Sequence, residues 1–276
     1  MKNLTFNNRF LVGLMALAVC VSWGVKSLSA QQPWPYKKSN SAVMDSRKAN
    51  ELRRDKNQAL RALGTPTQAQ RDALRKYYVL HVFAGMTQPA ALDDAMRLPN
   101  WRKEMVGDLE RLRGNTALDR YLRDDLAFSF LKRLVVGSKS GQYHPACRYN
   151  AALMIGMLND QEGDRNSSSP FAKPYSPGRA FLIQVAAAKS IPDSVRIAAL
   201  IGLRRHAELL AAGGSTDADL VRLLIGVIRA TVPPTAQADA AYWQKRVAIE
   251  AIGAMGPGGA APVLTPIVAD ENMPLS

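Results

Sequence analysis

The sequence is poor in the residues from which catalytic and metal sites are usually built. Its 276 residues include only two cysteines and three histidines, and aromatic residues account for 7%. No histidine stands at metal-ligand spacing from a second histidine, a cysteine or a carboxylate, and no CxxC pair occurs. We therefore expect no cofactor and no metal ion, and the sequence gives no sign of a small-molecule substrate.

What the chain does contain is apolar sequence that favours helices. Hydrophobic residues make up 47% of the chain, which is enough to bury a core, and charged residues make up 21%. Alanine and leucine are common, whereas runs of β-branched residues are scarce. This composition favours helix over sheet, and the predicted fold class is all-α.

The first thirty residues have the layout of a signal peptide. Lys2 and Arg9 form a basic start, an apolar run extends from Phe10 to Val25, and small residues lead up to Ala30. The apolar run is shorter than the roughly 20 residues that cross a bilayer. We expect cleavage near residue 30 and a periplasmic or secreted protein.

Two alternatives remain open for this segment. Leu28 fits poorly three residues before a cut at Ala30, so residues 10–25 could stay in place as a membrane anchor. The stretch Leu17–Cys20 weakly resembles the cleavage site of a lipoprotein signal. A cut near residue 30 would leave Cys147 as the only cysteine, so packing rather than an internal disulfide would hold the fold.

Beyond this segment, positive charge is concentrated in the first half of the chain. Residues 31–136 contain 20 Lys and Arg against 12 Asp and Glu, whereas residues 137–276 contain 13 against 11. Residues 31–46 are rich in Pro, Lys, Asn and Ser, and they are predicted to form a flexible linker. A basic helix is predicted next, over residues 47–63.

This basic helix has two interpretations. It is either a solvated helix tied down along one side or a contact surface for an anionic polymer, such as an envelope polymer or nucleic acid. In the second case, the candidate contacts are its basic side chains: Arg47, Lys48, Arg53, Arg54, Lys56 and Arg61.

A short motif occurs three times, at a spacing of about fifty residues. Each copy carries a basic residue, an alanine three positions later, and an aliphatic residue near its end. Repetition at this period predicts stacked helix pairs, in which small residues let neighbouring helices approach closely. We expect the basic residue to pair with an acidic group in the adjacent turn. The copies are CRYNAALMIG (Cys147–Gly156), VRIAALIGLR (Val195–Arg204) and QKRVAIEAIG (Gln244–Gly253), with Arg148, Arg196 and Lys245 as the basic residues.

The motif resembles the second helix of a HEAT repeat. Pro192–Arg196 is the nearest copy and Pro145–Arg148 the next, whereas the third copy has Gln244 in the aliphatic slot. The resemblance covers residues 117–269, about half of the chain, and it implies an α-solenoid of HEAT-like helix pairs. HEAT-repeat proteins are mostly binding scaffolds. Some relatives are lyase subunits or DNA-repair enzymes, so the resemblance leaves catalysis open.

Helix signals divide the chain into a helical N-terminal region, 47–116, and a repeat region, 117–276. Thr65 and Gln68 are predicted to form a capping box that starts a helix ending at Gly85. The repeat region is predicted to contain three helix pairs and an unpaired final helix. The predicted helices after the basic one are 65–84, 89–98, 101–113, 117–136, 145–158, 178–189, 192–212, 217–231, 239–255 and 260–269.

His144 and Cys147 raise the question of a reactive thiol. A cysteine in the first turn of a helix has a lowered pKa and is a candidate nucleophile beside a histidine. However, Cys147 fills the aliphatic slot that Val195 occupies in the next motif copy, which favours a buried structural cysteine. His81 and His206 lie in helical patterns and are predicted to be partly buried structural residues.

Residues 159–177 form the longest stretch without a helical pattern. Three acidic residues alternate at its start, and serines and prolines follow. Such a segment is a mobile surface loop, a partner-contact loop or a calcium site, although the spacing is not that of an EF-hand. The candidate residues of a partner loop are Asp160, Glu162, Asp164 and Tyr175.

These patterns support three functions in order of preference. The first is an exported, non-enzymatic scaffold that binds a protein partner through its stacked-helix surface. The second is a binder of an anionic polymer through the basic N-terminal half, and the third is a HEAT-like enzyme or lyase subunit. Arg and Lys clustered on one face would favour the polymer, an apolar groove would favour a protein, and a deep pocket around His144 would favour an enzyme.

Overall fold

The computed structural model describes residues 35–61, 64–137, 140–163, 170–232 and 238–269. The predicted signal peptide, residues 1–30, therefore lies outside the described residues. The chain divides into Met1–Pro35 and one compact unit, Tyr36–Ser276. This unit is mostly helical, as predicted. Within the ranges described, none of the helices combines the length and apolar character needed to cross a membrane.

The helices follow the predicted order closely. The α-helices are α2 (Ser46–Leu60), α3 (Gln68–Arg75), α4 (Ala90–Asp93), α5 (Arg97–Arg111), α6 (Thr116–Arg120), α7 (Ser129–Val136), α8 (Pro145–Gly156), α9 (Ser176–Ala187), α10 (Asp193–Ala212), α11 (Ala218–Arg229), α12 (Ala238–Ala254) and α13 (Pro257–Val268). Two π-helical segments, η1 (Lys76–Phe83) and η3 (Tyr121–Phe128), continue α3 and α6, and two short 3₁₀ turns are η2 (Leu112–Gly114) and η4 (Ser140–Gln142).

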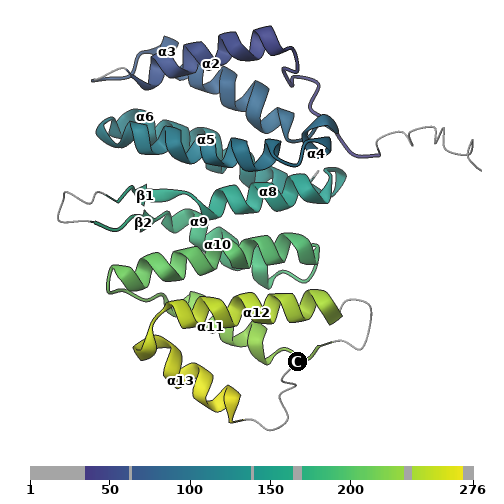
Figure 1. Ribbon diagram of the computed structural model, residues 1–276, viewed down its shortest axis with the longest axis vertical. Helices are drawn as coiled ribbons and strands as arrows, with labels where there is room; N and C mark the ends of the chain where they lie inside the picture. Colours follow the sequence, from purple (N-terminus) through teal and green to yellow (C-terminus); the bar gives the residue numbers. More distant parts are fainter. Residues whose placement is uncertain (1–34, 62–63, 138–139, 164–169, 233–237, 270–276) are drawn as a thin grey trace, which may run out of the picture. The chain divides into compact units, whose positions relative to one another are not determined.

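Helices from alternate positions in the chain pack side by side (Figure 1). In the C-terminal half, α10 packs between α8 and α12, and it also contacts α9. In the N-terminal half, α2 contacts α3 and η1, and η1 contacts η3. The name second-layer helices is used below for α2, α5, α8, α10 and α12.

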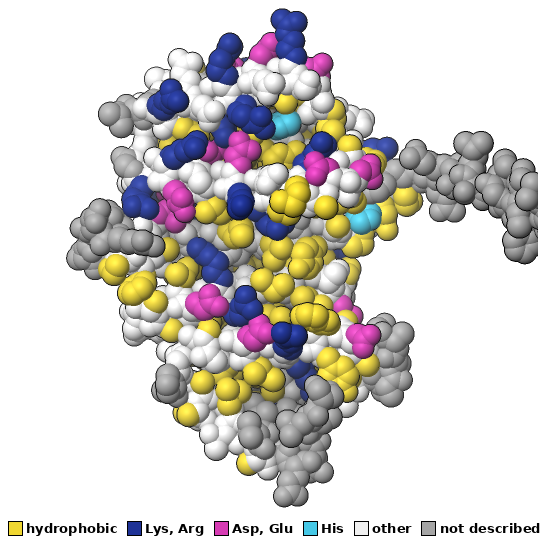
Figure 2. Space-filling model, in the orientation of Figure 1, with side chains coloured by type: hydrophobic (Ala, Val, Ile, Leu, Met, Phe, Trp, Pro, Cys, Tyr) yellow, Lys and Arg dark blue, Asp and Glu magenta, His cyan; other side chains and the backbone are white. Residues whose placement is uncertain are grey.

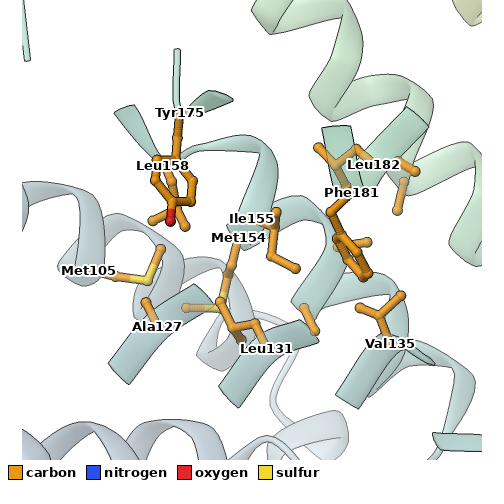
Figure 3. Close-up of a cluster of buried hydrophobic side chains, with 14 of the residues drawn as sticks. Met105, Ala127, Leu131, Val135, Met154, Ile155, Leu158, Tyr175, Phe181 and Leu182 are labelled. Carbon is orange, nitrogen blue, oxygen red and sulfur yellow. The ribbon is translucent and has the colours of Figure 1, made fainter. Parts of the chain in front are cut away.

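One core runs through the predicted N-terminal and repeat regions. Its buried apolar side chains extend from Leu52 to Ala260. Figure 3 shows Met105 of α5 beside Leu131 of α7 and Met154 of α8 in a single cluster. The described residues of the predicted N-terminal and repeat regions therefore share one core.

The start of α3 differs from the predicted capping box. Thr67, not Thr65, is the cap: its hydroxyl accepts the Gln70 backbone N–H at 3.3 Å, and the Gln70 side chain accepts the Thr67 backbone N–H at 2.8 Å. Thr67 has the extended backbone, φ −76° and ψ 161°, that a capping residue adopts. The cap therefore lies two residues further along the chain than predicted.

The small residues of the motif do allow close helix contact, as predicted. A Cβ atom added at Gly156 would lie 2.5 Å from the Cα atom of Gly202, and one added at Gly202 would lie 2.9 Å from that of Gly156. Contacts this short exclude any side chain at either position. The pair therefore sets the distance between α8 and α10.

The basic residue of the motif has a different role from the predicted one. Arg148 donates to the carbonyl of Val135 at 2.9 Å, and Arg196 donates to the carbonyl of Ala186 at 3.1 Å. Each carbonyl lies in the last turn of the preceding helix, where carbonyl groups lack helical partners and favour positive charge. Among the described residues, Arg196 also makes the predicted pair with an acid, Asp193, at 3.0 Å. The motif arginine thus joins the two helices of a pair.

The described part of residues 31–46, the predicted flexible linker, makes hydrogen bonds to the helical body. The Lys37 backbone N–H donates to the carbonyl of Gln142 at 2.7 Å, and that of Val43 donates to the carbonyl of Leu80 at 2.7 Å. The Gln88 side chain binds the carbonyl of Ser39. These bonds use backbone groups of the segment, so its Pro-, Lys- and Ser-rich composition gave no sign of them.

The described parts of the segment 159–177, residues 159–163 and 170–177, contain regular structure that was not predicted. They form a two-stranded antiparallel ribbon, β1 (Asn159–Gln161) and β2 (Lys173–Pro174) (Figure 1). Arg123 donates to the backbone carbonyls of Asn159 and Asp160, each at 3.2 Å. Arg205 donates to the Asn159 side chain at 2.9 Å. Two arginines from distant helices therefore hold the base of the ribbon.

Candidate interaction surface

An apolar groove opens between α4, α5 and α8. It has a volume of about 330 Å³ and is open along one side. Surface hollows of this size that are mostly apolar, with a few polar groups at the edge, are typical binding sites. The lining residues are Ala91, Leu92, Asp94, Ala95, Leu98, Pro99, Arg102, His144, Ala146, Tyr149 and Asn150.

Polar side chains at the edge of this groove are held in place. The Arg102 guanidinium donates to the side-chain oxygen of Asn150, which fixes α5 to α8 beneath the groove. Asp94 pairs with Arg97 at 3.5 Å. Met96, in the same turn, is 59% exposed. Methionine is flexible and polarisable, so it adapts to varied apolar partners.

His144 lies in the groove wall but acts as a helix cap. Its Nδ1 atom accepts the Ala146 backbone N–H at 3.1 Å at the start of α8. The Tyr36 ring packs edge-on against the imidazole, with 4.7 Å between the ring centroids. Burial lowers the pKa of His144, so the imidazole is neutral at pH 7 and its Nδ1 acceptor is preserved.

Cys147 is buried, which confirms the structural interpretation of this residue. Burial raises the pKa of its thiol to about 12, against a smaller opposing effect of Arg148. Since the thiolate is the reactive form, this thiol is unsuited to nucleophilic attack at neutral pH. His144 therefore lines the groove, but the buried Cys147 thiol does not act as a nucleophile beside it.

The structure corrects the assignment of Lys56 as a contact for an anionic polymer. Its side chain is only 2% exposed, and its ammonium lies 2.7 Å from Glu104 and 2.6 Å from Asp108. The hydroxyl of Tyr77 donates to Glu104 at 2.7 Å, and that of Tyr78 donates to Asp108 at 2.7 Å. These five side chains, which we call the Lys56 network, join α2, η1 and α5.

Electrostatics within the Lys56 network match this pairing. Burial raises the pKa of Glu104, but hydrogen bonds from Lys56 and Tyr77 outweigh it and hold the pKa below its usual value. Burial and the Asp108 carboxylate raise the pKa of Tyr78 well above its usual value. Glu104 is thus ionised and Tyr78 protonated at neutral pH, as their hydrogen bonds require.

The other basic candidates on and beside α2 are exposed, but several of them have acidic neighbours. Arg47 and Lys48 both approach Glu51, at 3.7 and 3.5 Å, and Arg54 lies 3.7 Å from Asp55. Arg53 lies 3.7 Å from Glu104, while Arg61 follows the helix and is exposed. On the face drawn in Figure 2, Arg and Lys alternate with acidic and apolar side chains. That face carries no continuous basic patch.

The predicted partner-loop residues separate into different environments. Tyr175 is buried against Phe128, so it belongs to the core and cannot serve as a contact residue. Asp160 accepts hydrogen bonds from Ser176, which fixes it at the start of α9. Glu162 accepts the Asn159 side-chain amide at 2.7 Å. Asp164 lies outside the described residues.

Asp160 and Glu162 nevertheless line a second, polar pocket of about 320 Å³. Burial raises the pKa of Asp119 in this pocket to about 6, although the nearby Arg123 opposes the rise. Burial likewise raises the pKa of Glu162. In the part of the chain that the structure describes, no group of three His, Cys, Asp or Glu side chains could hold a metal ion. The remaining lining residues are Arg113, Thr116, Asn159 and Gln161.

Comparison of the chain with family models, curated proteins and solved structures gave no match. The candidate surfaces therefore rest on the geometry alone. Sequence reasoning missed the α4–α5–α8 groove, although one signal was present: Met96 is an apolar residue in the turn before α5, where polar residues are usual.

Proposed function

We propose that this protein is an exported HEAT-like scaffold that binds a protein partner through its second-layer helices. Three features support the proposal: the threefold motif, the side-by-side packing of α8, α10 and α12, and the arginine bonds that join the helices of a pair. Such stacks present an extended surface built from helices that contact only their neighbours. The signal-peptide layout of residues 1–30 supports export.

The α4–α5–α8 groove is the observation that carries the proposal. Its lining is mostly apolar and includes Asp94 and Arg102, and the exposed Met96 directly follows the lining residue Ala95 in the chain. An open groove of this size accepts one or two bulky apolar side chains of a peptide or helix, while the polar edge fixes their orientation. We propose that the partner inserts such a segment here.

Binding of an anionic polymer is the weaker proposal. Lys56 is buried, and acidic side chains lie within 4 Å of Arg47, Lys48 and Arg54. Interspersed charges of both signs do not build the single-sign field that such a polymer requires. A HEAT-like enzyme is weaker again, because His144 serves as a helix cap and Cys147 is buried.

Photo-cross-linking in the producing cells tests the groove. A photoreactive amino acid in place of Met96 should capture one protein species. The matched control is the same substitution at Phe171, an exposed apolar residue near the ribbon that is 52% exposed. Capture of the same species with equal yield from both positions, or from Phe171 alone, would show that the groove is not the partner site.

A further inference from the structure

The outer face of α12 lacks the cover that earlier second-layer helices receive. Ala152 on α8 and Leu200 on α10 occupy the motif position of Ile249 on α12. Both are 0% exposed, whereas Ile249 is 41% exposed. Among the described residues, α12 is the last second-layer helix (Figure 1).

A comparison of Gly253 with Gly156 also shows that this side of α12 is uncovered. Gly253 occupies the motif position of Gly156. The space above Gly156 is filled by Gly202 of the next helix, but a Cβ atom added at Gly253 would meet no atom within 4 Å. Because an α-helix has 3.6 residues per turn, Tyr242, Ile249 and Gly253 lie along one side of α12. We call these three residues the α12 face, and Tyr242 is also exposed.

The residues of and beside this face are arranged so that the face matches a copy of itself. Arg246 and Glu250 lie symmetrically about Ala248, and Tyr242 and Gly253 lie almost symmetrically about the same point. In an antiparallel pair related by a two-fold axis, residues at equal distances on opposite sides of that axis face each other. Each Arg246 would then face a Glu250, each Tyr242 would rest over a Gly253, and the two Ile249 side chains would meet at the centre.

The charges at these positions suit this pairing. Glu250 now accepts from Arg246 at 3.0 Å and from Arg204, and it is only partly buried. Hydrogen bonds from Arg246 and Arg204 lower the pKa of Glu250, so the carboxylate is ionised at neutral pH. A second Arg246 can approach it without displacing either bond, since a carboxylate accepts several donors.

We propose that two copies of this chain associate through the α12 face, antiparallel and about a two-fold axis near Ala248. This surface is separate from the α4–α5–α8 groove, so the inference does not depend on the proposed partner. One α12 face per copy is a small interface, and the dimer is therefore concentration dependent. An isologous contact closes on itself, so assembly stops at two copies.

Exchange of charge between two variants tests the pairing. Arg246→Glu should face Glu250 of its copy and repel it, and Glu250→Arg should likewise face Arg246. Each variant alone should dimerise about tenfold or more weakly than the wild-type protein, since close charge pairs at interfaces have large coupling energies. An equal mixture should dimerise again, because the heterodimer restores two opposite-charge pairs.

The measurement is sedimentation velocity of the purified protein over a range of concentrations. Arg222→Glu on the exposed side of α11 is the matched control and should dimerise like the wild type. Gly253→Leu should abolish the dimer while circular dichroism stays unchanged, because open space surrounds this position in one copy. A wild-type protein that stays monomeric at every concentration, or a mixture no more dimeric than its components, would overturn the proposal.

Discussion

The protein joins its neighbouring helices in two contrasting ways. Between α2, η1 and α5 the contact is polar, with the Lys56 ammonium held by two carboxylates that also accept two tyrosine hydroxyls. Between α8 and α10 the contact is made by Gly156 and Gly202, whose backbones touch. The polar contact is weakened when any one of its partner side chains is removed. The glycine contact is weakened when a side chain is added at either glycine.

The largest expected effect comes from breaking the polar junction. Lys56→Met removes the buried cation and leaves Glu104 and Asp108 only the more exposed Arg53 and Arg111, at 3.7 and 3.3 Å. Loss of one partner from a buried charge pair costs about 3–5 kcal/mol. Chemical denaturation should show a free energy of unfolding that is lower by this amount.

The control variant removes the Asp108 charge together with the Lys56 charge. Lys56→Met combined with Asp108→Asn should recover part of the stability, because fewer buried charges are left unpaired. A Lys56→Met protein as stable as the wild type would show that the ammonium does not hold the two carboxylates.

Adding one methyl group should break the glycine junction. In Gly156→Ala the new Cβ atom would sit 2.5 Å from the Gly202 Cα atom, so α8 and α10 must move apart. Overpacking of this kind costs about 1–3 kcal/mol, and contact with backbone places the loss at the upper end. Thermal unfolding should show a lowered midpoint, and an unchanged midpoint would mean that the helices are not held at this distance.

His206 provides a pH test of the C-terminal half. Burial is the main cause that lowers its pKa to about 3, with Arg205 and Arg179 adding to it. The unfolded chain therefore takes up a proton below pH ~6.5 while the folded chain does not. Between that pH and about 3, this group should lower the free energy of unfolding by about 1.4 kcal/mol per pH unit.

The variant His206→Leu isolates this contribution. This variant should lose the pH dependence of the free energy of unfolding that His206 contributes, because leucine fills a similar buried space without titrating. The acid sensitivity that comes from other groups should remain. Denaturation curves at pH 6.5 and pH 5 give the comparison. Equal losses in the wild type and the variant between these two values would exclude His206 as the source.

The smallest expected effect is at Gly253, the counterpart of Gly156. A Cβ atom at Gly253 meets nothing within 4 Å, and alanine favours a helix over glycine by about 1 kcal/mol. Gly253→Ala should therefore be neutral or slightly stabilising in a single copy. If Gly253→Ala lowered the thermal midpoint as much as Gly156→Ala, then Gly253 would be covered by neighbouring atoms as Gly156 is.

Close contact between the motif helices could be predicted from the sequence, whereas the polar junction could not. Small residues recur in the motif, but Gly156 and Gly202 stand at different motif positions, so the repeat did not identify this pair. Lys56 has partners that lie 48 and 52 residues further along the chain. A signal was nevertheless present, because Lys56 shares one helix side with Leu52 and Leu60, both buried.

Long-range bonds also explain the remaining differences. The ribbon at residues 159–174 is held by Arg123 and Arg205, which lie on helices far from it in the sequence. The segment before α2 is held by hydrogen bonds of its backbone groups. Those groups are present whatever the side chains are, so the sequence does not reveal the bonds. The π-helical segments η1 and η3 pack against each other, and tertiary contact of this kind leaves no local sequence signal.

The α4–α5–α8 groove is tested most directly by the affinity of the partner captured from Met96. We predict that Met96→Asp, which places a charge next in the chain to the lining residue Ala95, weakens binding about tenfold or more. Phe171→Asp should bind like the wild type, and the affinity should change little between low and high salt. Equal affinities for Met96→Asp and the wild type, or a steep loss with salt that Arg54→Glu reproduces, would contradict the groove as the partner site.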